Sequence, residues 1–360
     1  MPNSIKICYI LPEYSENIAG HFYHHYELLK ELSKRLDIFL ILEKSDSNDI
    51  KLANKVYIQK FRFIPLRMLE SFLAILKARF LGYKIFYTHY CYIGGINAAI
   101  ISKLFGGKSY YWNCAMNWLF RQRTLPGWGY KLSMKLSHCL VTGSREMKKG
   151  YIEHYNLKSE RIKIMPNWVN LNRFKSAKNQ ITKSKSRTIL FIHWLSKRKG
   201  ADMIVPIMNN LKLRIKNLKL VVIGEGPYKD KLLEEIKENR LEEFIEILGG
   251  IPHKQITDYY SMANIFLMPS MEEGFPRVLL EAMASGIPYV ASDVGAVREI
   301  SPEAAQKFLV KPGDVEMFVN KIETLLSDKK VYDKFRKEEL KKVKEYSLEK
   351  IIDKFIDIIS

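Results

Sequence analysis

Two glutamates, Glu273 and Glu281, stand around a predicted helix start with seven residues between them. Glu273 precedes the helix, and Glu281 lies in its second turn. Backbone amides at a helix N-terminus, together with the helix dipole, favour a phosphate or another anion. A carboxylate beside such a site can accept hydrogen bonds from sugar hydroxyls. The spacing indicates a site for a phosphorylated sugar, and a helix cap at Glu273 with a surface residue at Glu281 is an equally weighted alternative.

The surrounding residues predict the strand and helix that this site needs. Residues 264–268, which are apolar after Asn264, predict a buried strand, after which Gly274 permits a bend. Pro276 suits the first turn of a helix over residues 277–285, and residues 289–291 resume a strand. In such a βαβ unit the helix begins at the carboxyl end of a parallel strand. The expected anion donors are the amides of Arg277, Val278 and Leu279.

The segment EGFPRVLLEAMASGIP, which begins at Glu273, resembles the signature of the family 4 retaining glycosyltransferases. These are sugar-nucleotide-dependent enzymes of the GT-B fold. Three other segments resemble the family in the same order: IMPNWVNLNRF at 164–174, FIHWLSKRKG at 191–200 and LVVIGEGP at 220–227. The resemblance covers nearly the whole chain and implies an α/β fold. Two Rossmann-like parallel-sheet domains would face a central cleft, and a C-terminal helix would return to the first domain.

The resemblance also implies a site for a nucleotide diphosphate sugar. Glu281 would hold the ribose hydroxyls, Glu273 would contact the donor sugar, and Lys199 would neutralise the diphosphate. Residues 248–251 would line the base. The other expected donor-binding residues are Gly274, Phe275, Pro276, Arg277, Val278, Leu279, Gly20, Gly224 and Gly249. A plain turn glycine is nearly as good an interpretation of Gly20.

The chain departs from the family pattern after the predicted strand that begins near residue 188. Many members have a glycine and then an arginine where this chain has His193 and Trp194. Neither Lys197 nor Arg198 is in register with that arginine. The predicted diphosphate contact therefore rests mainly on Lys199 and the helix N-terminus.

Two residues are candidates on the acceptor side. His89 follows the predicted strand 85–88 and matches a family position beside the acceptor, which makes it a third catalytic candidate. A core histidine is an equal alternative. Asn113 follows the strand 109–112 where many members have a histidine, and we expect its amide to replace that hydrogen bond.

Positive charge is concentrated in the first half of the chain. Residues 1–180 hold 28 lysines and arginines against 12 acids, whereas residues 181–360 hold 30 against 27. Residues 61–83 combine apolar residues at helical spacing with basic residues, and residues 116–131 mix aromatic and basic residues. The pattern predicts an anionic acceptor or contact with an anionic membrane surface. The candidate contacts are Trp118, Arg121, Arg123 and Trp128.

Neither segment is long and apolar enough to span a bilayer. An ordinary amphipathic core helix is an equal alternative for residues 66–81. Without a secretory signal pattern at residues 1–4, we expect a cytoplasmic protein that is peripheral on the inner face of the membrane.

Composition predicts the domain boundaries. Residues 175–187 are polar and basic and predict a linker between an acceptor domain, 1–174, and a donor domain, 188–330. The family resemblance further implies that a charged helix over 331–360 would return to the first domain. The four cysteines and eight histidines lack metal-ligand spacing, so we expect no metal and no cofactor.

These features predict a retaining, metal-independent hexosyltransferase. Its donor would be a UDP- or GDP-linked sugar, and its acceptor a lipid-linked glycan, lipopolysaccharide or capsular polysaccharide. A sugar-nucleotide epimerase is the alternative. A nucleic-acid-binding protein has low weight because the chain has no such motif, and a dinucleotide oxidoreductase would need a Gly-x-Gly-x-x-Gly motif. The base, the sugar and the oligomeric state are left open.

Overall fold

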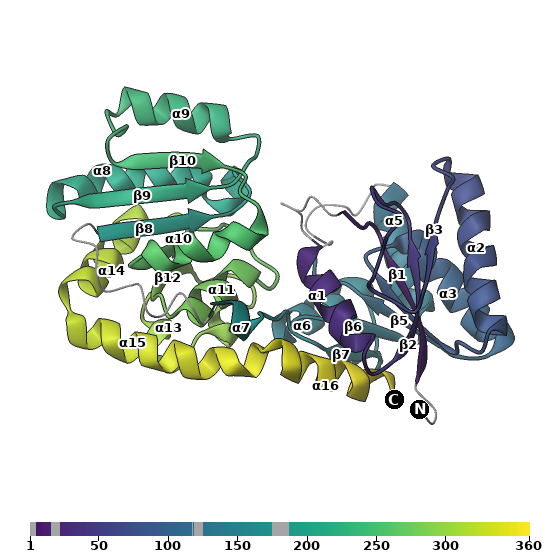
Figure 1. Ribbon diagram of the computed structural model, residues 1–360. Helices are drawn as coiled ribbons and strands as arrows, with labels where there is room; N and C mark the ends of the chain where they lie inside the picture. Colours follow the sequence, from purple (N-terminus) through teal and green to yellow (C-terminus); the bar gives the residue numbers. More distant parts are fainter. Residues whose placement is uncertain (1–4, 16–21, 117, 119–124, 175–186) are drawn as a thin grey trace. The chain divides into compact units, whose positions relative to one another are not determined.

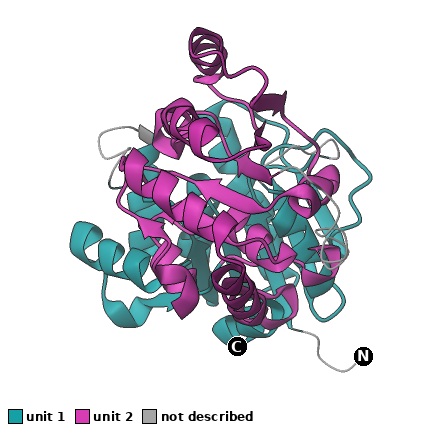
Figure 2. Ribbon diagram, turned by 90° about the vertical axis from the view of Figure 1, so that its left-hand side faces the viewer, with its two compact units in different colours: residues 1–166, 351–360 teal, residues 167–350 magenta. Residues whose placement is uncertain are grey.

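The computed structural model describes residues 5–15, 22–116, 118, 125–174 and 187–360. The chain forms two compact units (Figure 2). Unit 1 comprises residues 1–166 and 351–360, and unit 2 comprises residues 167–350. The predicted linker, apart from Arg187, lies outside the described residues.

Unit 1 is built on a seven-stranded parallel sheet in the order β3-β2-β1-β4-β5-β6-β7. The strands are β1 (Lys6–Leu11), β2 (Asp37–Leu42), β3 (Lys55–Ile58), β4 (Ile85–His89), β5 (Lys108–Trp112), β6 (Cys139–Thr142) and β7 (Ile162–Ile164). The central strands read as nearly continuous apolar runs because helices cover both faces of the sheet. The chain turns back between β1 and β4, as doubly wound sheets do.

The helices of unit 1 lie on the two faces of this sheet. They are α1 (Tyr23–Leu32), α2 (Ile64–Phe80), α3 (Tyr92–Phe105), α5 (Leu125–Leu136), α6 (Arg145–Tyr155) and the end of α16 (Leu348–Ile359). Figure 1 shows α2 and α3 on one side of the sheet and α1 on the other. On the first side, Cys8 and Ile10 of β1 belong to one core cluster with Ala74 and Ile75 of α2.

Unit 2 is built on a six-stranded parallel sheet in the order β10-β9-β8-β11-β12-β13. The strands are β8 (Arg187–Ile192), β9 (Leu218–Ile223), β10 (Ile245–Gly249), β11 (Ile265–Met268), β12 (Tyr289–Ser292) and β13 (Leu309–Val310). The helices are α7 (Leu171–Phe174), α8 (Ile204–Arg214), α9 (Lys229–Glu238), α10 (Ile256–Met262), α11 (Arg277–Ser285), α12 (Val297–Ile300), α13 (Glu303–Gln306), α14 (Val315–Ser327) and α15 (Lys329–Lys342). Both units thus have the predicted Rossmann-like architecture.

The C-terminal segment differs from the single charged helix that the sequence predicted. It consists of α15, a short 3-10 turn at Val343–Tyr346, and α16. The break has a backbone cause: the amide of Val169 donates to the carbonyl of Tyr346 at 3.0 Å, and the amide of Leu348 donates to the carbonyl of Val169 at 3.1 Å. These bonds hold Ser347 in extended conformation, which a continuous helix would not allow.

Two features bear on the predicted surroundings of the protein. Among the residues that the structure describes, no helix combines the length and apolarity needed to cross a bilayer. The four cysteines are buried as thiols, and burial raises the pKa of Cys8, Cys91, Cys114 and Cys139.

The end of α16 is anchored in unit 1 by Phe355. Its ring is fully buried, with centroid distances of 4.7 Å to Tyr87 and 6.1 Å to Tyr9. We expect Phe355→Ala to lower the free energy of unfolding by about 3–5 kcal/mol, because it leaves a cavity in the core. Urea unfolding would measure the change. The matched control is Phe80→Ala, since Phe80 is 72% exposed and its truncation should change stability by less than about 0.5 kcal/mol. Equal effects of the two substitutions would contradict this account of the C-terminal anchor.

Candidate functional site

The candidate site of unit 2 gathers where its parallel strands end. Lys199 lies in a 3-10 turn, Lys197–Lys199, that follows β8. Glu273 lies in the loop between β11 and α11, and β11 pairs directly with β8. Adjacent parallel strands bring the loops at their carboxyl ends together, and ligands of such sheets bind at this edge. The topology therefore places these two predicted catalytic residues side by side.

Glu273 is a buried carboxylate held by three donors. Lys199 Nζ lies 2.7 Å from Oε2, and the Ser270 hydroxyl donates to Oε1 at 2.8 Å. His193 Nε2 lies 2.9 Å from the same Oε1. Burial by itself would raise the pKa of Glu273, but His193 and Lys199 outweigh it and lower the pKa to about 2. Glu273 is therefore ionised at neutral pH.

The hydrogen bonds of His193 define its tautomer. The backbone amide of Trp194 donates to Nδ1 at 2.9 Å, so the ring proton must be on Nε2, which donates to Glu273. Burial lowers the pKa of His193 despite the neighbouring carboxylate. The imidazole is therefore a neutral donor, and Lys199 supplies the positive charge of this cluster.

Lys199 is the least solvated cation of the site. Its side chain is 8% exposed, and burial lowers its pKa although Glu273 opposes the shift. Arg198 points to a different acid, with Nη1 2.7 Å from Glu272 Oε1, and is about half exposed. An ammonium group with few waters to lose can move from a carboxylate to an incoming diphosphate without a large new desolvation penalty.

Glu281 lies on α11 and is also buried. Its Oε1 is 2.9 Å from His253 Nε2, and the Tyr260 hydroxyl donates to Oε2 at 3.0 Å. Burial would raise the pKa of Glu281, but His253 and then Arg277 lower it. Burial, and then Glu281, raises the pKa of Tyr260, so its hydroxyl stays a donor. This carboxylate thus has an imidazole and a phenol as hydrogen-bond partners, with the Arg277 guanidinium as a further cation that lowers its pKa.

Glycines let the surrounding loops approach one another. Gly295 has φ of +55°, and a Cβ there would collide with the carbonyl oxygen of Glu273. Gly224 has φ of +149°, and a Cβ there would collide with the carbonyl of His193. The amide of Gly224 also donates to the carbonyl of Gly249 at 2.8 Å. The hydrogen bond between the predicted glycines 224 and 249 therefore joins the loops after β9 and β10. The close approach of Gly224 to His193 places these loops beside the loop after β8.

The helix N-terminus forms as the sequence predicts. Pro276 has extended backbone and no polar side chain to cap α11, which begins at Arg277. Val278 and Leu279 complete the first turn. Phe275 is held by a hydrogen bond to its carbonyl from Asn167 Nδ2 at 2.8 Å, and the carbonyl of Gly274 accepts from the amide of Ala296 at 3.0 Å. The loop that precedes the helix is thus fixed at both of its central residues.

His89 of unit 1 lies at the end of β4 and is fully buried. The Tyr9 hydroxyl is 2.7 Å from its Nδ1, and the Trp112 ring centroid is 4.2 Å away. Burial lowers the pKa of His89 well below its usual value, so it is a neutral group. Its predicted catalytic role stays a prediction.

The other acceptor-side residues have mixed surroundings. Asn113 is buried, with Oδ1 accepting from the amide of Ala115 at 2.8 Å. Trp118 stacks on His154 of α6 at 5.3 Å, whereas Trp128 of α5 is 64% exposed. Gly20, Arg121 and Arg123 lie outside the described residues.

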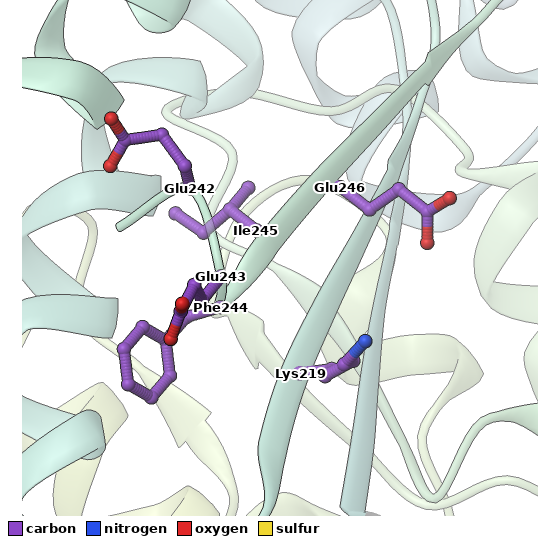
Figure 3. A pocket seen from close by; sticks show the side chains of 6 residues that line it. All are labelled: Lys219, Glu242, Glu243, Phe244, Ile245 and Glu246. Atoms are coloured by element: carbon purple, nitrogen blue, oxygen red, sulfur yellow. The ribbon is translucent and has the colours of Figure 1, made fainter. Parts of the chain in front are cut away.

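A shallow pocket at the other end of the sheet does not match the predicted chemistry (Figure 3). Its volume is about 410 Å³, and its lining residues are Lys219, Glu242, Glu243, Phe244, Ile245 and Glu246. These residues lie at the start of β9 and β10, away from the carboxyl ends of the strands. Three acids and one lysine would also repel a diphosphate.

No three His, Cys, Asp or Glu side chains converge as metal ligands would in the part of the chain that the structure describes. Sequence reasoning also missed four partners of the two glutamates, His193, Ser270, His253 and Tyr260. A histidine directly after a buried strand was the available signal for His193, since the βα loops of a parallel sheet form its site. The same position after a buried strand was available for Ser270, and the sequence offered no comparable signal for His253 and Tyr260.

Residues 172–342 match the family described as "Glycosyl transferases group 1". The match confirms the glycosyltransferase resemblance at the level of this group, and membership of family 4 stays a prediction. A 2-deoxystreptamine N-acetyl-D-glucosaminyltransferase of Niallia circulans is 30% identical over 150 residues, which are 42% of this chain and 39% of that protein. The matched region spans between about a third and half of the length of the first curated relatives.

Solved structures confirm the fold. HepE of Anabaena, crystallised with UDP and glucose, has a TM-score of 0.79 at 16% identity, covering 98% of this chain and 99% of HepE. The lipopolysaccharide outer core galactosyltransferase WaaB has a TM-score of 0.73 at 16% identity, covering 98% of this chain and 99% of WaaB. At these identities the likeness shows the GT-B fold alone, and the predicted fold class is correct.

The lowered pKa of Glu273 predicts how the stability of the protein depends on pH. The folded state binds this proton only near pH 2, whereas a glutamate with the usual pKa of 4.5 takes it up earlier. Stability from this group is therefore present above about pH 4.5 and is lost as pH falls toward 2. We expect Glu273→Gln to reduce the slope of the unfolding free energy against pH in this window. The reduction should correspond to about one bound proton. Urea unfolding at a series of pH values measures it, and an unchanged slope would exclude an ionised, stabilised Glu273.

Proposed function

We propose that this chain is a retaining glycosyltransferase that uses a UDP- or GDP-linked sugar. The observation that supports this most is the cluster of Glu273, Lys199 and His193 beside the N-terminus of α11, inside a group 1 domain. A carboxylate, a poorly solvated ammonium group and a helix N-terminus at one sheet edge suit a sugar that carries a diphosphate.

The chemical step would use these groups as follows. The bond between the anomeric carbon and the diphosphate oxygen breaks, and negative charge develops on the leaving diphosphate. Lys199 and the α11 N-terminus would stabilise that charge, so we infer that no metal ion is obligatory. Glu273, released by Lys199, would hold the donor sugar while the acceptor hydroxyl attacks the same face. The hydroxyl proton would pass to the departing diphosphate oxygen, and the configuration is retained.

Glu281 would hold the nucleotide. Its buried carboxylate would exchange the bonds from His253 and Tyr260 for bonds from the ribose hydroxyls, and residues 248–251 would line the base. HepE has been crystallised with UDP, which supports UDP as the first nucleotide to test on this chain.

The acceptor is proposed from unit 1. We infer a lipid-linked glycan or a surface polysaccharide of the lipopolysaccharide or capsule type, handled at an anionic membrane surface on the cytoplasmic side. The excess of positive charge in residues 1–180 supports an anionic partner. WaaB, which shares the fold, is described as a lipopolysaccharide outer core galactosyltransferase, which supports a glycan acceptor of this type. His89 and Asn113 are the proposed hydrogen-bonding groups for this acceptor.

Nucleotide binding tests the donor site. We expect UDP or GDP at a hundredfold excess over its dissociation constant to stabilise the protein by about 2.7 kcal/mol, which raises Tm by a few degrees. ADP, CMP and NAD are tested in parallel, to show whether binding depends on the base and on the class of nucleotide. Glu281→Gln should abolish most of the shift because it removes the ribose-binding carboxylate.

The matched control is Glu246→Gln, an exposed glutamate on β10, which should retain the wild-type shift. If no nucleotide diphosphate shifts Tm, the donor-site proposal fails. If a nucleotide sugar binds and is converted without any acceptor, the protein is an epimerase.

A further inference from the structure

The outer face of α2 is apolar, which is unusual for a helix that covers a sheet. Four large side chains form a stripe along it at helical spacing, and their exposed fractions are 44% for Leu66, 56% for Leu69, 54% for Leu73 and 72% for Phe80. Helices on sheets ordinarily bury such residues and expose polar ones. The exposed leucines therefore need a physical explanation.

The inner face of α2 shows that this orientation is fixed. Its buried residues are Glu70, Ser71, Ala74, Ile75 and Ala78. Small side chains let the helix lie close to the sheet, and Glu70 is satisfied by the Tyr57 hydroxyl at 2.9 Å and by the amides of Lys60 and Phe61 at 2.9 and 3.1 Å. Asn97 of α3 also donates to the carbonyl of Met68 at 2.9 Å. Rotating the helix to bury the leucines would break these bonds.

The apolar surface extends beyond the helix at both ends. The Phe80 and Phe105 rings are 5.9 Å apart, and the Arg79 guanidinium donates to the carbonyls of Phe105 and Gly106 at 2.9 and 2.8 Å. The ends of α2 and α3 therefore form one surface. We call it the α2 face, and its exposed apolar residues are Phe61, Phe63, Ile64, Leu66, Met68, Leu69, Leu73, Phe80, Leu81, Leu104 and Phe105.

The charge around this face is predominantly positive, although Arg67 of α2 lies 3.8 Å from Glu43. Residues 51–145 hold fifteen lysines and arginines and a single acid, the buried Glu70. Exposed cations stand on and beside the helices that carry the face: Lys60, Arg62, Lys77, Lys84 and Lys103. A second copy of the same face would bring these like charges together, and a nucleic acid would leave the leucines without an apolar partner. An anionic lipid surface matches both the apolar residues and the cations.

We propose that the α2 face docks the protein on an anionic phospholipid bilayer. The helix of 17 residues would lie along the interface over about 25 Å, with its leucines and phenylalanines among the acyl chains and its cations among the headgroups. Trp128 on α5 is exposed near Lys131, whose Nζ is 5.7 Å from its ring, and α5 packs against α3 through Ser133, which donates to the carbonyl of Tyr92 at 2.8 Å. An exposed tryptophan on the same helical layer suits a second contact at headgroup level. The inference specifies the surface for the membrane location proposed above and is independent of the donor chemistry.

Vesicle flotation tests the proposal. The full chain is mixed with vesicles of phosphatidylcholine alone or with one third phosphatidylglycerol, at low and high salt. We expect binding to the anionic vesicles, weakened by salt, and a loss of at least about tenfold in the double variant Leu69→Glu/Leu73→Glu. The matched control is Leu213→Glu/Leu233→Glu, which adds the same charge at exposed leucines of α8 and α9 in unit 2 and should bind as the wild type does.

Each other outcome overturns the proposal. Equal binding of the two double variants would mean that another surface docks. Failure of the wild type to bind anionic vesicles would exclude the membrane, and conversion of a wild-type dimer to a monomer by Leu69→Glu/Leu73→Glu would make the partner a second copy. The UDP-induced shift of Tm is measured on every variant. Retention of that shift with loss of vesicle binding separates failure of the α2 face from failure of the donor site.

Discussion

The buried carboxylate of Glu273 is the group on which the candidate site of unit 2 depends most. A charge removed from water needs direct partners, and here Lys199, His193 and Ser270 supply them. The partners come from the loops after β8 and β11, which are adjacent only because these strands pair in parallel. The strand order is thus a condition for the ion pair. Removing the lysine alone would leave a buried carboxylate with hydrogen-bond donors but without its ammonium partner, which is far less favourable than losing an exposed pair.

The second glutamate shows how a similar side chain acquires different chemistry from different surroundings. Glu281 has an imidazole and a phenol as partners, both of which are exchangeable hydrogen-bond donors. Glu273 has an ammonium group in addition. A neutral ligand with two hydroxyls can replace the donors of Glu281 one for one. A ligand that separates Lys199 from Glu273 must instead bring negative charge of its own. The two sites therefore select different parts of one ligand, a diol and an anion.

Local sequence patterns predicted many of the helices and strands, whereas contacts between distant parts of the chain determined the partners of the site residues. The helix over 277–285 and the strands near residues 85, 109 and 264 were predictable because apolar period, glycine and proline determine them locally. The partnership of Glu281 with His253 was not predictable, because it depends on how α11 packs against the loop after β10. The break at Ser347 has the same kind of cause, since Val169, far away in the chain, provides the pairing. For α2 the helical period was correct, but the period alone does not say which face turns inward. Alanine and serine made the tighter contact with the sheet, and the leucines were left outside.

The two units also carry their charge in different ways. In residues 181–360 the acids and bases nearly balance, and the cation of the candidate site is held against a carboxylate in a poorly solvated place. Its interaction with an anion is short-ranged and weakly screened. In unit 1, residues 51–145 hold fifteen lysines and arginines and a single acid, so the fields of these cations add over distance and salt screens them. Selection of a small ligand requires a buried cation held against a carboxylate, because discrimination comes from contact. Attraction to an extended anionic surface requires many exposed cations, because their weak interactions must act together.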